Sequence, residues 1–173
     1  MRVYLAGSIF YAGDVYRNTD WAARIRAAIP SIDLYNPLEA DFNGPEGKKR
    51  FAGSRIITDG DCERLHNTDV LVVCMDGDVI PAGSSCEIGI MSEKIRNGAH
   101  KHIIGICTDN RQCYLTHSEE KDKGGAAELG EQQYSYQNLF VTGIVKQSGV
   151  MVSSIEEAIE ILKEYDKEDY GEC

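Results

Sequence analysis

The sequence predicts an α/β domain, specifically a flavodoxin-like or Rossmann-like three-layer sandwich with a mainly parallel five-stranded sheet. Two observations lead to this prediction. Short apolar runs alternate along the chain with longer stretches of helical periodicity, which is typical of parallel strands joined by crossover helices. One run, Val70 to Met75, is apolar throughout, as expected of a strand that helices cover on both faces.

The first third of the chain supplies two predicted strands and two predicted helices. In order, these are a strand at 2–6, a helix at 16–28, a strand at 32–35 and a helix at 56–66. Gly7-Ser8 follows the first strand, Pro30 ends the first helix and Asn36-Pro37 stops the second strand. Residues 38–50 are polar and contain glycine and proline, which indicates an irregular excursion between elements.

The rest of the chain continues the alternation. The predicted elements are a strand at 69–75, a helix from about 85 to 96, strands at 102–107 and 139–145, and a final helix at 155–165. Asn97-Gly98 is a typical C-cap, and Ser153-Ser154-x-x-Glu157 is a capping box. The polar stretch 108–133 is long for a plain connection and is a candidate lid, and the acidic tail 166–173 is expected to fray.

Length and charge narrow the classes of function. A chain of 173 residues, 42% of them hydrophobic, is long and apolar enough to form one domain with a substantial core, over residues 1–173. A net charge of −10 argues against nucleic acid as a partner, because phosphate binding needs a basic face.

The cysteines and the N-terminus bear on the cellular compartment. The six cysteines form no C-x-x-C pair, and no ligand spacing predicts a metal site. The N-terminal residues lack the apolar segment of a signal peptide, and no apolar run approaches membrane-spanning length. We therefore expect a cytoplasmic protein with no membrane partner.

Glu87 is the first carboxylate of interest, because it follows the buried strand at the start of a predicted helix. It shares a helix face with Met91 and Ile95, so its side chain should point toward apolar surroundings. Two interpretations are open: a nucleophile kept ionised by the helix N-terminus, or an ordinary partner of the helix dipole. The neighbouring Cys86 points about 100° away, so the two side chains cannot face one reacting atom.

Asp61 is the second carboxylate of interest. It lies between Ile57 and Leu65 at spacings of four, on the helix stripe that should face the interior. Such a carboxylate is paired, protonated or in a cavity, unless the helix bends outward near Gly60 and leaves it in water. If both carboxylates enter the crevice at the strand ends, they suit acid/base or nucleophilic chemistry at a glycosidic centre.

Four segments, taken together and in this order, resemble the nucleoside 2-deoxyribosyltransferase family. They are YLAGSIF at 4–10, DCERLHNTD at 61–69, GSSCEIG at 83–89, and Asn138-Leu139. The resemblance runs from the first predicted strand to the last helix. It implies transfer of a 2-deoxyribosyl group between nucleobases, with a deoxynucleoside and a free nucleobase as substrates and no cofactor or metal.

The resemblance also implies roles for individual residues. Glu87 looks like the nucleophile that attacks C1′, giving a deoxyribosyl-enzyme and overall retention by a ping-pong route. Asp61 looks like the carboxylate that contacts the sugar or the reacting centre, and Tyr4 and Gly7 would line the pocket. Asn138 matches a residue that binds the deoxyribose hydroxyl in a neighbouring subunit's site, which implies a homo-oligomer with shared active sites.

One position departs from the family pattern. Many members carry an aspartate that contacts the base six residues before the nucleophile, where this chain has Pro81. Asp76 or Asp78, in the same loop, could substitute for it. With Gly83, which opens the third motif, Asp76 completes the expected substrate-binding residues.

Two alternatives stay open at this point. Related 2′-deoxynucleoside 5′-monophosphate N-glycosidases are hydrolases that share the fold and the nucleophilic glutamate and bind a phosphate. Ser84 and Ser85 at a helix N-terminus could hold such an anion, although serine there is also a common N-cap. The second alternative is a non-catalytic nucleotide-sensing domain, which would not need an ionised Glu87.

Overall fold

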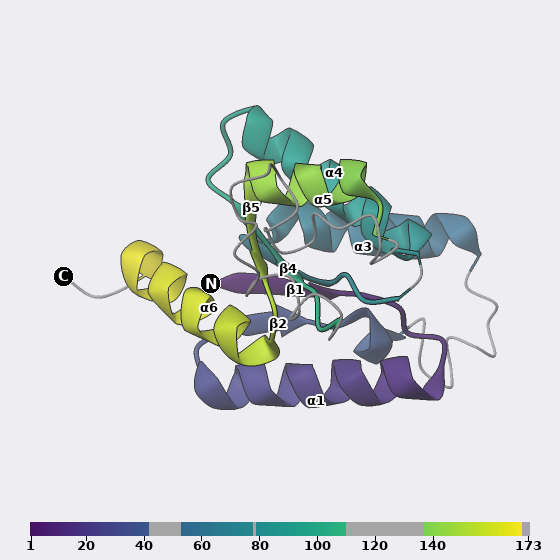
Figure 1. Ribbon diagram of the computed structural model, residues 1–173, viewed down its shortest axis with the longest axis horizontal. Helices are drawn as coiled ribbons and strands as arrows, with labels where there is room; N and C mark the ends of the chain where they lie inside the picture. Colours follow the sequence, from purple (N-terminus) through teal and green to yellow (C-terminus); the bar gives the residue numbers. More distant parts are fainter. Residues whose placement is uncertain (42–52, 78, 110–136, 171–173) are drawn as a thin grey trace, which may run out of the picture.

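The computed structural model describes residues 1–41, 53–77, 79–109 and 137–170. Within them the strands are β1 (Arg2–Ala6), β2 (Asp33–Tyr35), β3 (Val70–Cys74), β4 (His102–Ile106) and β5 (Gly149–Val152). The helices are α1 (Ala12–Ala28), the 3₁₀ helix η1 (Pro37–Glu39), α3 (Ser54–Asn67), α4 (Ala82–Arg96), α5 (Leu139–Ser148) and α6 (Ile155–Tyr170). Figure 1 shows their arrangement.

The five strands of these residues form one sheet in the order β2-β1-β3-β4-β5, and every neighbouring pair is parallel. The chain runs outward from β1 to β2 and then returns to place β3 on the other side of β1. This order is the flavodoxin-like one, and it confirms the predicted fold class. In such sheets, ligands bind beyond the carboxyl ends of the strands where the order reverses, here between β1 and β3.

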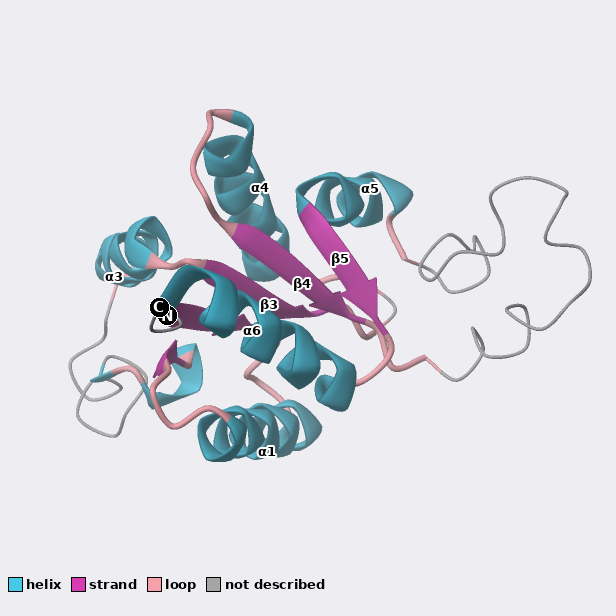
Figure 2. Cartoon of the chain, turned by 90° about the vertical axis from the view of Figure 1, so that its left-hand side faces the viewer, coloured by secondary structure: helices cyan, strands magenta, loops and turns pink. Residues whose placement is uncertain are grey.

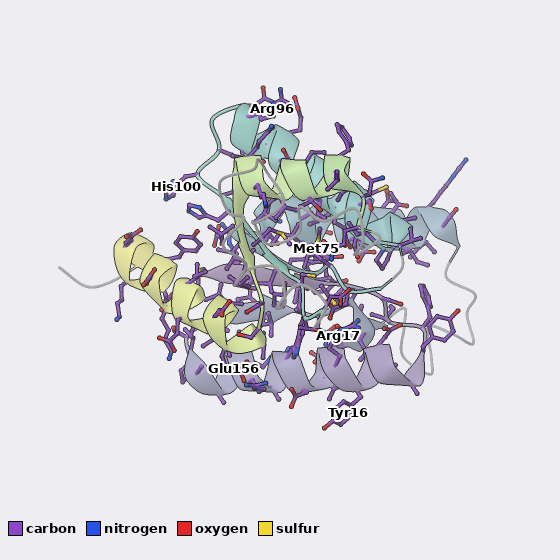
Figure 3. The ribbon with its side chains drawn as sticks, in the orientation of Figure 1. Tyr16, Arg17, Met75, Arg96, His100 and Glu156 are labelled. Atoms are coloured by element: carbon purple, nitrogen blue, oxygen red, sulfur yellow. The ribbon has the colours of Figure 1, made fainter. Side chains whose placement is uncertain are left out.

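Helices cover both faces of the sheet, with α1 and α6 on one side and α3, α4 and α5 on the other (Figure 2). Alternate residues of β1 divide between the two layers. Val3 and Leu5 pack with Trp21 and other side chains of the α1–α6 layer, whereas Tyr4 packs in the α3–α5 layer. Met75 is buried near the middle of the molecule, while labelled side chains such as Tyr16 lie at its periphery (Figure 3).

Most predicted elements are confirmed with small shifts at their ends, but the predicted strand at 139–145 is wrong. This segment is helix α5, and Asn138 caps it by accepting hydrogen bonds from the backbone of Phe140 and Val141. The fifth strand follows at Gly149–Val152. Its first residue approaches β4 so closely that a Cβ would lie 1.8 Å from the Ile103 carbonyl oxygen, which leaves room for glycine alone.

The last helix is longer than predicted. Residues 166–170, expected to fray, continue α6 to Tyr170. The capping box at its start is confirmed: the Ser154 hydroxyl accepts from the Glu157 backbone, and the Glu157 carboxylate accepts from Ser153. Most of the candidate lid at 108–133, most of the excursion at 38–50, and Asp78 lie outside the described residues. None of the described helices combines the length and apolar character needed to cross a membrane.

Candidate active site

Tyr4 is the centre of the candidate site. It lies in β1, fully buried, opposite Tyr35 of β2 in the parallel register, and the two ring centroids are 5.0 Å apart. Its hydroxyl donates a hydrogen bond of 2.7 Å to Glu87 Oε1. Burial, followed by the charge of Glu87, raises the pKa of Tyr4 far above its usual range, so the phenol keeps its proton and acts as a donor.

Glu87 lies deeper in its helix than the sequence indicated. Helix α4 begins at Ala82, so Glu87 occupies the second turn, and the expectation that a helix N-terminus keeps it ionised is wrong. The same placement removes the helix-dipole interpretation. Met91, one turn further on the same face, is fully buried, so the side chain of Glu87 points inward as predicted.

The surroundings of Glu87 make its negative charge costly. Burial raises the pKa of Glu87 to about 7, the hydrogen bond from Tyr4 offsets part of this rise, and the charge of Asp61 adds to it. At neutral pH the group is therefore divided between its acid form and its carboxylate. A carboxylate stabilised so weakly gains more than an ordinary one from a cationic partner.

Asp61 faces the same cluster from α3. The Tyr35 hydroxyl donates to Asp61 Oδ1 at 3.1 Å, and the Tyr4 hydroxyl also contacts this carboxylate. Helix α3 continues through Gly60, so Asp61 is paired rather than exposed by a bend. Burial raises the pKa of Asp61, and the two phenols act against that rise. The hydroxyl of Tyr4 thus lies between two half-buried carboxylates.

The residues predicted at the strand ends have contacts of their own. Gly7 directly follows β1 with a φ of +157°, and a Cβ there would lie 3.2 Å from that of Cys74, so the chain needs glycine for this approach. Asp76 follows β3 and accepts hydrogen bonds of 2.6 and 2.7 Å from the backbone and hydroxyl of Thr108. Asp76 therefore ties the ends of β3 and β4 together.

Ser84 and Ser85, considered from the sequence as part of an anion site, lie inside α4. Pro81 is the N-cap, and Gly83 is exposed in the first turn. The Ser84 side chain is buried, and the Ser85 backbone N–H already donates to the Pro81 carbonyl. The two serines are therefore part of the helix rather than its cap.

Asn138 is exposed at the start of α5, where its side-chain oxygen serves as the N-cap. The structure thus brings Tyr4, Asp61 and Glu87 into one connected cluster. It holds Gly7, Asp76, Gly83 and Asn138 in separate surroundings along the carboxyl edge of the sheet. No group of histidine, cysteine, aspartate and glutamate among the described residues is arranged to hold a metal ion.

Tyr35 and Arg64 are site residues that the sequence reasoning missed. Tyr35 ends β2 and pairs with Asp61, and the Arg64 guanidinium lies 5.1 Å from the centroid of the Tyr35 ring. One signal was available: Arg64 lies three residues after Asp61, so both occupy one side of the same helix. The contact between Tyr35 and Tyr4 depends on strand pairing, which the local sequence does not reveal.

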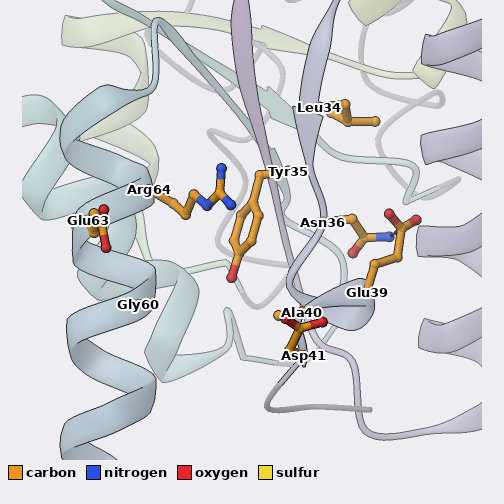
Figure 4. A pocket seen from close by; sticks show the side chains of 9 residues that line it. All are labelled: Leu34, Tyr35, Asn36, Glu39, Ala40, Asp41, Gly60, Glu63 and Arg64. Carbon is orange, nitrogen blue, oxygen red and sulfur yellow. Dashed lines mark hydrogen bonds between the residues drawn. The ribbon is translucent and has the colours of Figure 1, made fainter.

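A cavity of about 380 Å³ opens beside Tyr35, between α3 and η1 (Figure 4). Its charged lining is mainly acidic, with Glu39, Asp41 and Glu63 against the single cation Arg64 among its described residues. Arg26 pairs with Glu39 at 2.7 Å from outside this lining. The arrangement suits a neutral or polar ligand better than a phosphate.

Known proteins are similar to this chain in sequence and in fold. The family model for nucleoside 2-deoxyribosyltransferase matches residues 3–154. A crystal structure of a conserved protein from Enterococcus faecalis V583 is similar at 30% identity and a TM-score of 0.74, over 95% of this chain and 98% of that one. No protein of curated function matches the sequence.

Two solved deoxyribosyltransferases share the fold at low identity. The 2-deoxyribosyltransferase of Bacillus psychrosaccharolyticus is 12% identical with a TM-score of 0.54, over 92% of this chain and 90% of that one. The 2-desoxiribosyltransferase of Leishmania mexicana is 15% identical with a TM-score of 0.56, over 98% of both chains. With the family model matching most of its length, this chain belongs to the nucleoside 2-deoxyribosyltransferase family.

Proposed function

We propose that the protein transfers a 2-deoxyribosyl group between nucleobases through a covalent deoxyribosyl-enzyme formed on Glu87. The observation that carries the proposal is the Tyr4–Glu87 hydrogen bond of 2.7 Å beside the second carboxylate, Asp61. Two carboxylates gathered around one buried phenol suit glycosyl transfer.

In the first half-reaction, a carboxylate oxygen of Glu87 attacks C1′ of the deoxynucleoside. The C1′–N bond breaks, its electron pair stays with the leaving base, and that base takes up a proton from solvent. Because Tyr4 holds Oε1, the other oxygen of Glu87 is the one left to attack. The sugar passes through a state with oxocarbenium character, whose positive charge the carboxylates of Glu87 and Asp61 stabilise.

In the second half-reaction, a ring nitrogen of another base attacks C1′ and loses its proton to solvent. The Glu87–C1′ bond breaks and returns its electron pair to the carboxylate, so two inversions give overall retention. The raised pKa of Glu87 supports this cycle. An anion that its surroundings stabilise weakly is a better nucleophile and gains more from the cationic transition state.

We further infer a homo-oligomer whose subunits share active sites through Asn138. The supporting observation is that Asn138 is exposed and is followed by exposed apolar side chains, with Leu139 41% and Phe140 77% accessible. Contact with a second copy would cover them. Cys62, Cys74, Cys86 and Cys107 are free thiols, which supports a cytoplasmic location. Exchange of bases between deoxynucleosides would place the enzyme in nucleotide salvage.

The decisive experiment mixes one 2′-deoxynucleoside with a second free base, testing purines and pyrimidines in turn. Transfer yields a new deoxynucleoside, whereas hydrolysis of a nucleoside or its 5′-monophosphate yields free deoxyribose or its 5-phosphate. Glu87→Ala should abolish exchange while circular dichroism shows a folded chain.

The matched control is Glu93→Gln, an exposed glutamate on the same helix, which should exchange bases at the wild-type rate. Base exchange by Glu87→Ala at the wild-type rate would contradict the covalent mechanism. Ligand binding without any turnover by the wild type would favour the sensing alternative.

A further inference from the structure

We propose that Tyr35 is the positioning residue of Asp61, and that Arg64 holds the Tyr35 ring in place. This inference rests on the proposed function, since it gives Tyr35 a part in the reaction that acts through Asp61 and not through the reacting atoms. Its physical basis is a set of contacts joining β1, β2 and α3, and each of them can be broken by a single substitution.

The Tyr35 ring is confined between the side chains of Tyr4 and Arg64. Tyr4 packs against it at 5.0 Å between centroids with a tilt of 54°, and the Arg64 guanidinium lies 5.1 Å from its centroid. In Figure 4 the guanidinium lies beside the ring, and the hydroxyl points away from the body of β2. Because Arg64 and the phenol's acceptor, Asp61, lie on the same helix, α3 fixes both the ring and its hydrogen-bond partner.

Two phenols donate hydrogen bonds to the two carboxylates. A phenol has one proton to donate. Tyr4 contacts both carboxylates, yet its strong hydrogen bond goes to Glu87 at 2.7 Å. Tyr35 provides the second proton, directed at Asp61 Oδ1. Each carboxylate thus has a phenol of its own, and Tyr4 remains committed to Glu87.

Charged and polar side chains surround Tyr35. The groups that face this cluster are Tyr4 from β1, Asp61 and Arg64 from α3, and Glu87 from α4. Burial and the two carboxylates raise the pKa of Tyr35, and Arg64 acts against that rise. A more acidic phenol is a stronger donor. Arg64 therefore strengthens the hydrogen bond that orients Asp61, besides confining the ring.

The test replaces Tyr35 with phenylalanine, which removes the hydroxyl and keeps the ring. Carboxyl ¹³C NMR then follows the titration of Asp61 and Glu87, with signals assigned from Asp61→Asn and Glu87→Gln. The titration midpoint of Asp61 should rise by about one pH unit in Tyr35→Phe, because its ionised form loses a donor. Tyr16→Phe, at an exposed tyrosine of α1, should leave both midpoints unchanged.

Base exchange provides the second readout. In Tyr35→Phe, kcat should fall about tenfold with KM within about twofold of wild type, since substrate contacts remain while Asp61 loses its orientation. Arg64→Met should also raise the titration midpoint of Asp61, by less than Tyr35→Phe does. Arg64→Lys keeps the positive charge and should bring that midpoint part of the way back to the wild-type value.

Three results separate the possible failures. An unchanged Asp61 midpoint in Tyr35→Phe overturns the positioning role, and no turnover is needed to see it. If Tyr35→Phe shifts the Asp61 midpoint but leaves kcat unchanged, the hydrogen bond from Tyr35 has no role in the reaction. Absence of base exchange in the wild-type protein overturns the proposed function itself. That assay uses the wild-type protein, so its outcome is distinguished from the titration of Tyr35→Phe.

Discussion

Two carboxylates on opposite faces of the sheet are held in contrasting ways. Asp14, on α1, pairs with Arg17 at 3.0 Å and accepts hydrogen bonds from the Ser8 hydroxyl and the Tyr11 backbone. Glu87, on α4, has a phenol as its hydrogen-bond partner and the like-charged Asp61 nearby. Both lie near the carboxyl edge of the sheet, so their different partners decide what each can do.

The pKa values move in opposite directions as a result. Burial opposes ionisation of Asp14, but its hydrogen bonds and Arg17 outweigh burial and hold the pKa below its usual range. Burial dominates at Glu87 and raises its pKa to about 7. A carboxylate with a cation and several donors is a structural anchor, here of the loop after β1. A carboxylate whose hydrogen-bond donor among the described residues is a phenol keeps a poorly stabilised charge, which a cationic transition state can stabilise.

The largest expected effect is on catalysis by Glu87→Gln. The amide keeps the size of the side chain and can still accept from Tyr4, but it is no longer a nucleophile. Base exchange should fall by about 10³-fold or more. Steady-state exchange assays measure this, and Asp14→Asn is the matched control on the opposite face. A comparable loss in folded Asp14→Asn would show that the two carboxylates do not differ as argued.

A smaller effect is expected for Tyr4→Phe, which removes the donor to Glu87. Because that hydrogen bond lowers the pKa of Glu87, the pKa should rise above about 7 in the variant. Wild-type exchange should increase with pH through about 7 as Glu87 ionises. In Tyr4→Phe the same rise should occur at higher pH, with exchange at pH 7 reduced roughly tenfold. An acid limb at the wild-type position would contradict the role given to Tyr4.

The sequence could predict the site only where the determinants are local. Strands β1, β3 and β4 follow from continuous apolar runs, and the inward face of Glu87 follows from its spacing to Met91. Tyr35 could not be found in this way, because its neighbour Tyr4 is brought to it by strand register. The apolar segment after Asn138 is compatible with a strand in the sequence, because apolarity alone does not separate a strand from a buried helix. The segment is a helix, and the Asn138 side chain caps its first turn.

For Asp14, removal of the charge should affect stability rather than chemistry. Asp14→Asn leaves Arg17, which is 20% exposed, without its ion-pair partner and should lower the free energy of unfolding by about 1–2 kcal/mol at pH 7. The folded Asp14 pKa is lowered, so its contribution is present above pH 3.8 and is lost as the pH falls through the folded value. Urea unfolding at pH 7 and pH 3 measures both. An equal difference between wild type and variant at the two pH values would contradict this account.

The opposite pH dependence of stability is expected at Glu87. Its folded pKa of about 7 exceeds the ordinary glutamate value of 4.5, so between these values the folded state binds more protons than the unfolded one. Stability must then fall as pH rises from 4.5 to about 7 and level off above. Glu87→Gln has no such charge to bury, so its advantage over wild type in urea unfolding should grow across this window. Asp61 is present in both proteins, so the difference between them reports on Glu87. If the difference in unfolding free energy between Glu87→Gln and wild type stayed constant from pH 5 to pH 8, the folded protein would stabilise the Glu87 charge as well as water does. The contrast with Asp14 would then have no physical basis.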